Sequence, residues 1–110
     1  MTSLCSDGKN SNMKAKLIHR DRIQYDDFSF AEVVIYEVPE PKTPSKHFYK
    51  YRLAYIEKQI CVLRYDNETG KGDHKHIYEN EFVYDFINID KLISDFQEDI
   101  KRWKNENFNT

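Results

Sequence analysis

The fold of this chain is decided by residues 49–65, YKYRLAYIEKQICVLRY. Side chains alternate across a β-strand, and every second position of residues 49–55 is aromatic or aliphatic. We therefore predict two strands, Lys46–Glu57 and Gln59–Tyr65. They are joined as a hairpin through Glu57-Lys58, so the sheet is expected to be antiparallel at this point.

Further strands are predicted on both sides of the hairpin, at Lys14–Tyr25, Phe28–Val38 and, as a short one, Glu81–Phe86. Phe28–Val38 has apolar residues on both of its sides, which favours a central strand covered on both faces. Residues 39–44, PEPKTP, hold every proline of the chain. Proline lacks a backbone donor, so this segment is expected to be a stiff, exposed connector.

The C-terminal part of the chain predicts a helix that begins with Asn88 or Asp90 as its cap. An apolar stripe at helical spacing follows: Ile89, Leu92, Ile93, Phe96, Ile100 and Trp103. The stripe is expected to pack against the sheet, because an apolar sheet face needs a cover. The predicted fold class is α+β, an antiparallel four- to five-stranded sheet with one C-terminal helix packed on a face.

The chain has 110 residues, a net charge of −2 and 15% aromatic residues, which indicates one globular domain. We expect a flexible tail at residues 1–12, the domain at 13–106 and a C-terminal tail at 107–110. The charge is unlike that of a basic nucleic-acid binder. Cys61 lies in an apolar run and is expected to be a buried free thiol. No stretch has membrane-spanning length or the form of a signal peptide, so we expect a cytoplasmic protein without a membrane partner.

Residues 64–76, RYDNETGKGDHKH, join a predicted strand to a turn and then to two histidines. Asparagine and glycine tolerate positive φ, which is typical of a turn. If the segment after the turn is extended, His74 and His76 point to the same side. The alternative interpretation is a polar hairpin end with solvated histidines.

Three chemistries are compatible with this segment. A metal would need ligands such as His74, His76 and Asp66 or Asp73. Zinc sites usually have a second ligand pair at a characteristic sequence spacing, and this sequence has no Cys pair and no HExxH motif. We therefore predict no metal and no cofactor. The spacing of Gly70 and Gly72 does not fit a phosphate-binding P-loop.

The third and most specific hypothesis is RNA cleavage by acid–base catalysis. RNA carries its own nucleophile, the 2′-hydroxyl, so an enzyme needs a base, an acid and cations for the phosphorane charge. The predicted catalytic residues are His74, His76, Lys75 and Arg64. The predicted RNA-binding residues are Arg52, Lys71, Tyr65, Asp66 and Asn67. The competing interpretation is ordinary strand packing for the tyrosines and solvent exposure for the cations.

Residues 64–76, with their Arg-Tyr-Asp-Asn and His-x-His pattern, resemble the signature of the TumE-type toxin family. The similarity extends over Lys14 to Trp103 and includes YRLAY at 51–55, Tyr84-x-Phe86 and LIxDF at 92–96. It implies a prokaryotic toxin of a type II toxin–antitoxin system. Its partner would be a cognate antitoxin, often a helix-turn-helix DNA-binding protein.

The resemblance also implies RelE-like RNA cleavage, with RNA or the ribosome as a further partner. We therefore predict an RNA-targeting, metal-independent endoribonuclease. The alternative is a non-catalytic RNA- or protein-binding module of an uncharacterised family.

Overall fold

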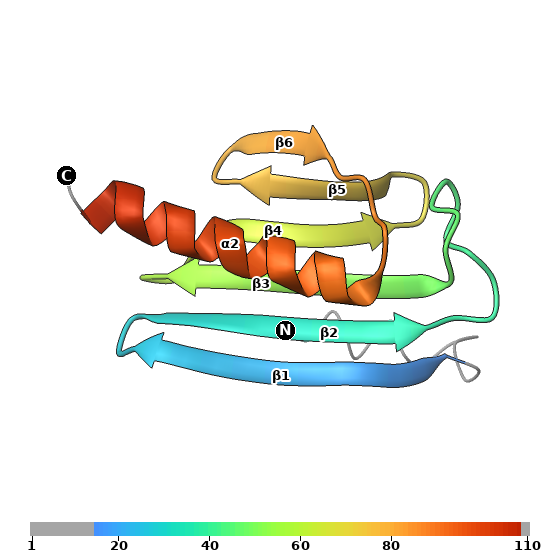
Figure 1. Cartoon of the computed structure of the whole chain (residues 1–110), viewed down its shortest axis with the longest axis horizontal. Helices are drawn as coiled ribbons and strands as arrows, with labels where there is room; N and C mark the ends of the chain where they lie inside the picture. Colours follow the sequence, from blue (N-terminus) through green and yellow to red (C-terminus); the bar gives the residue numbers. More distant parts are fainter. Residues whose placement is uncertain (1–14, 109–110) are drawn as a thin grey trace.

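The computed structural model describes residues 15–108, and within them the chain forms a six-stranded sheet and one long helix (Figure 1). The elements in chain order are β1 (Lys16–Asp26), β2 (Ser29–Glu37), β3 (Tyr49–Glu57), β4 (Ile60–Glu68), β5 (Gly72–Ile77), β6 (Asn80–Val83) and α2 (Ile89–Phe108). The strands lie in the sheet in sequence order, and all neighbours are antiparallel. The tail expected at residues 1–12 lies outside the described residues.

The predicted α+β class is confirmed, with a strand count somewhat higher than four to five in the described part of the chain. The added strand is β5, which pairs with β4 directly after the glycine-containing turn. The strand predicted at Glu81–Phe86 is β6, which begins one residue earlier and ends at Val83. The predicted helix is also present, and it extends to Phe108.

The hairpin between β3 and β4 turns at Lys58 and Gln59, one residue later than the predicted Glu57-Lys58. Both residues have positive φ, 50° and 70°. This is the pattern of a type I′ turn, whose twist matches that of the flanking strands. Neither residue is the glycine or asparagine that usually marks such a turn, which explains why the sequence misplaces it.

Helix α2 lies across one face of the sheet, over its central strands (Figure 1). Asn88 caps it, because the Asn88 Oδ1 accepts a hydrogen bond of 2.8 Å from the backbone nitrogen of Lys91. The predicted apolar stripe is confirmed: Leu92, Phe96 and Ile100 are buried in the core. The side chains that they meet come from alternate positions of β2, β3 and β4: Ala31, Val33, Ile35, Tyr51, Leu53, Tyr55, Leu63 and Tyr65.

The interpretation of β2 as a strand covered on both faces is wrong for the described residues. Of residues 15–108, only α2 forms a helix over the sheet, and it covers one face. On the other face, Phe30, Glu32 and Tyr36 of β2 remain partly exposed, although Val34 is buried. Apolar residues on both sides of a strand can therefore pack against side chains of neighbouring strands, and they do not require a covering layer on each face.

The tyrosines of the core direct their hydroxyl groups at carboxylates. The pairs are Tyr51 with Asp73, Tyr55 with Glu57, Tyr65 with Asp99 and Tyr84 with Asp95. Burial raises the pKa of each of these tyrosines, and the hydrogen-bonded carboxylate raises it further. Each hydroxyl is therefore a protonated donor, and each buried carboxylate has a partner.

We expect Phe96→Ala to lower the free energy of unfolding by about 3–5 kcal/mol, because it leaves a cavity between α2 and the sheet. Phe82→Ala is the matched control, since Phe82 is 46% exposed on β6. Its cost should be about 1 kcal/mol or less. Urea unfolding followed by circular dichroism measures both. Equal losses would contradict the placement of α2.

The turn of the β3–β4 hairpin offers a second test. The double substitution Lys58→Asn/Gln59→Gly should raise the free energy of unfolding by about 0.5–1 kcal/mol, because it relieves two left-handed L-residues. Lys58→Ala/Gln59→Ala is the control and should give no gain. The same urea titration reports both, and a loss of stability in the Asn-Gly variant would exclude the type I′ geometry.

Candidate functional site

The sheet face opposite α2 gathers most of the predicted site residues, and we call it the open face. Strand register places its side chains in two rows. One row runs Val34, Arg52, Asp66, His74, and the next runs Glu32, Ala54, Arg64, His76, Glu81. Cross-strand neighbours in such rows lie close enough to interact. We call Arg64, Asp66, His74, His76 and Glu81 the open-face cluster.

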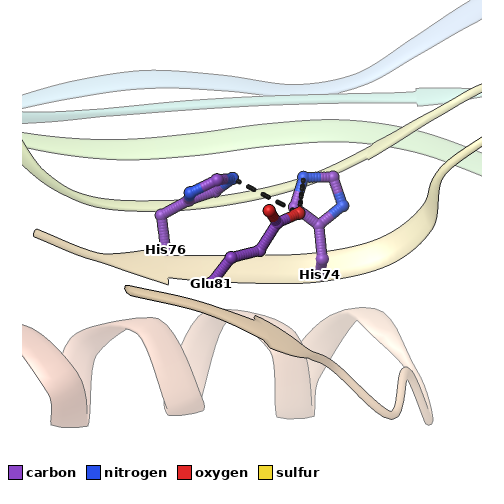
Figure 2. Close-up of side chains that lie close together, drawn as sticks. All are labelled: His74, His76 and Glu81. Atoms are coloured by element: carbon purple, nitrogen blue, oxygen red, sulfur yellow. Dashed lines mark ion pairs between the residues drawn. The ribbon is translucent and has the colours of Figure 1, made fainter. Parts of the chain in front are cut away.

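Figure 2 shows the side chains of His74, His76 and Glu81 on the side of β5 and β6 that faces away from α2. The Glu81 carboxylate lies between the two imidazoles. Its Oε2 is 3.7 Å from the Nε2 of His74 and 3.8 Å from the Nε2 of His76. The two rings are 5.1 Å apart and almost perpendicular. The three side chains therefore converge on one small volume.

His74 is the deepest member of the cluster, with only 4% of its surface exposed. Its Nδ1 lies 3.0 Å from the carbonyl oxygen of Gly72, a contact in which the ring nitrogen is the donor. Its Nε2 lies 2.7 Å from the Oδ1 of Asp66, within ion-pair distance. The ring is therefore fixed by its Nδ1, and the Nε2 faces the cluster.

His76 and Glu81 form the accessible side of the cluster. The side chain of His76 is 22% exposed and that of Glu81 is 46% exposed. Lys71, in the turn before β5, lies 3.5 Å from the Glu81 carboxylate. A ligand arriving from solvent would meet these groups first, with His74 and Asp66 behind them.

Burial lowers the pKa of His76, and the Arg64 guanidinium lowers it further. His76 is therefore neutral near pH 7. The pKa of Glu81 is also lowered: partial desolvation opposes the shift, but the Lys71 ammonium and both imidazoles outweigh it. The accessible side thus combines a neutral imidazole with an ionised carboxylate.

Several polar atoms of the cluster are buried without a hydrogen-bond partner among the described residues. They are the Nε of Arg64, the Oδ1 of Asp66 and the Nε2 of His76. Arg64 and Asp66 still lie within ion-pair distance, 3.1 Å. Buried polar atoms are usually satisfied, so these atoms mark a place where water or a ligand could bind.

Three predicted site residues lie on the helix face instead. Lys75 alternates with the two histidines and contacts Asp99 of α2 at 3.1 Å. Tyr65 is fully buried and donates to the same carboxylate. Asn67 is buried, accepts from the backbone nitrogen of Tyr51 at 2.9 Å and donates to a backbone carbonyl of β3. Tyr65 and Asn67 are buried in the core, whereas Lys75 keeps 25% of its side chain exposed beside α2.

Three residues differ from the sequence interpretation or were not part of it. Glu81 was not predicted, although it follows the same alternation as the histidines once β5 and β6 are paired. Cys61, expected to be buried, is exposed. His47 is a structural residue: its Nε2 lies 2.7 Å from Asp73 and its ring stacks on Phe86.

The fold and the site define an α+β protein with a histidine–carboxylate cluster on the free face of an antiparallel meander. The chain matches the family described as Toxin TumE over residues 9–104 and belongs to that family. Comparison with curated proteins found no match, and comparison with solved structures found none either. Within the described residues, α2 is too polar to cross a membrane.

Lys75 allows the two faces of β5 to be tested separately. Lys75→Met should lower the free energy of unfolding by about 1–3 kcal/mol, because the buried Asp99 carboxylate loses a charged donor. Lys91→Met is the control: Lys91 pairs with Asp95 at the surface, and its loss should cost less than about 1 kcal/mol. Thermal unfolding measures both. If the Lys75→Met variant is stable but no longer toxic, Lys75 is a functional residue and not only a structural one.

Proposed function

We propose that this chain is the toxin of a type II toxin–antitoxin pair and that it cleaves RNA without requiring a metal. The observation that carries the proposal is the convergence of His76, Glu81 and His74 on the open face. Family membership supports the toxin assignment. The proposed reaction is attack of the RNA 2′-hydroxyl on the adjacent phosphate. In this reaction the protein groups only move protons and stabilise charge.

In this proposal the unpartnered Nε2 of His76 takes the proton of the 2′-hydroxyl. The 2′-oxygen then bonds to phosphorus, and the bond to the 5′-oxygen breaks. His74, which lies beside Asp66, is the proposed acid. Its proton is transferred through the Glu81 carboxylate to the leaving oxygen. The products are a 2′,3′-cyclic phosphate and a free 5′-hydroxyl. Arg64 and Lys71 stabilise the phosphorane charge.

RNA would lie along the open face, where arginines from three strands point: Arg20, Arg22, Arg52 and Arg64. Aromatic rings on the same face offer stacking surfaces, and the Arg22 guanidinium already lies 3.9 Å from the ring centroid of Phe30. These groups replace the buried Tyr65 as candidate base contacts. The proposed partner is a cognate antitoxin of the helix-turn-helix type, in the cytoplasm.

Induced expression in a bacterial host tests the proposal. The native chain should arrest growth and degrade RNA. His76→Ala and Glu81→Gln should abolish both while leaving the protein folded, because the two side chains are partly exposed. Growth curves and total RNA on denaturing gels are the measurements. Loss of an acid–base group typically lowers a rate about 10²–10⁴-fold.

His19→Ala is the matched control, since His19 is exposed on β1, away from the cluster. It should remain fully toxic. Circular dichroism and thermal unfolding of each purified variant separate lost chemistry from lost folding. A folded His74→Ala/His76→Ala double variant that still arrests growth would disprove the proposed catalytic pair.

A non-catalytic module that blocks RNA or a protein is the second candidate function. The arginines of the open face favour it, because binding by charge needs no acid–base pair. Under this alternative, Arg52→Glu/Arg64→Glu would remove toxicity while His76→Ala would keep it. Cleaved RNA ends carrying a 2′,3′-cyclic phosphate would exclude this alternative.

A further inference from the structure

We infer that His74, His76 and Glu81 form a binding site for one divalent transition-metal ion of the zinc class. The three ligand atoms come from two paired strands and lie within 4.8 Å of one another. The site is distinct from the ligand set considered from sequence, which combined the histidines with Asp66 or Asp73. Its carboxylate comes from β6, opposite His76.

The three ligand atoms lie within 4.8 Å of one another, and two of their separations are close to those around a coordinated ion. Zinc binds nitrogen at about 2.0–2.1 Å, which places neighbouring tetrahedral ligand atoms about 3.3 Å apart. The carboxylate oxygen of Glu81 is 3.7 and 3.8 Å from the two imidazole nitrogens. His76 and Glu81 are both partly exposed, and Glu81 is on a short edge strand, so both side chains can move closer around an ion.

His74 has the outer contact that metal-binding histidines usually have. Its Nδ1 donates to the Gly72 carbonyl, which leaves the Nε2 lone pair facing the cluster. That Nε2 is 2.7 Å from the buried Oδ1 of Asp66 without a hydrogen bond between them. The negative charge of Asp66 at this distance favours a cation in the cluster.

The donor set selects the class of metal. Two imidazole nitrogens and one carboxylate suit Zn²⁺, Co²⁺ or Ni²⁺. Ca²⁺ and Mg²⁺ prefer oxygen ligands and are disfavoured. The positive charges of Arg64, within the cluster, and of Lys71, beside it, are offset by two carboxylates, Asp66 and Glu81.

A bound ion would occupy the same atoms that the proposed cleavage needs. The Nε2 of His76 could then no longer accept the 2′-hydroxyl proton, and Glu81 could not pass one on. Zinc is therefore expected to inhibit RNA cleavage, and a chelator is expected to restore it. This consequence, unlike the binding site itself, rests on the proposed function.

Calorimetric titration of the purified full chain with Zn²⁺ tests the site. The protein should carry Cys5→Ser/Cys61→Ser so that thiols do not contribute. We expect one ion per chain and a visible absorption band of tetrahedral Co²⁺ when cobalt replaces zinc. His76→Ala and Glu81→Gln should weaken binding by more than the about 10–100-fold typical of an outer contact.

His19→Ala should bind zinc as the parent does, and the thermal unfolding of every variant should be unchanged without metal. Unchanged affinity in both His76→Ala and Glu81→Gln, or no binding by the parent, would overturn the site. The titration contains no RNA, so an inactive toxin that binds zinc would contradict only the proposed function. Zinc that stimulates cleavage would overturn the inhibitory role.

Discussion

Strand register is the constraint on which the rest of the structure depends. Because side chains alternate with a period of two, a slip of one residue would move His74 and His76 to the helix face and bring Lys75 to the open face. Tight turns prevent this slip. Gly70 and Gly72, both with positive φ, set β5 against β4, and the turn at Tyr78, with φ of 57°, sets β6 against β5.

A single covering helix gives the two faces of the sheet different chemistry. The helix face is aromatic, and most of its polar side chains are paired in hydrogen bonds such as that of Tyr84 to Asp95, with the buried Ser29 Oγ as an exception. Acidic residues of α2 thus serve as acceptors for buried hydroxyls. The open face keeps its polar groups near one another but less fully paired. Unsatisfied groups concentrate where a ligand could satisfy them.

Alternation and the helical stripe were sufficient to predict β2, β3, β4 and α2, because each has an apolar face long enough to show its period. The same rule predicted that His74 and His76 share a side, and applied once more it places Lys75 on the other. Glu81 could not be found in this way. Its position depends on the pairing of β6, which follows a turn without the usual Asn-Gly signal.

The open-face cluster combines a rigid part with an adjustable one. His74 and Asp66 are buried on internal strands, and the Gly72 carbonyl fixes the imidazole. Glu81 lies on an exposed edge strand of four residues and can change its position at little cost. Proton transfer and metal binding need the same lone pairs at slightly different spacings. A fixed pair facing a movable carboxylate can meet either spacing, so the cluster is compatible with both of the proposed chemistries.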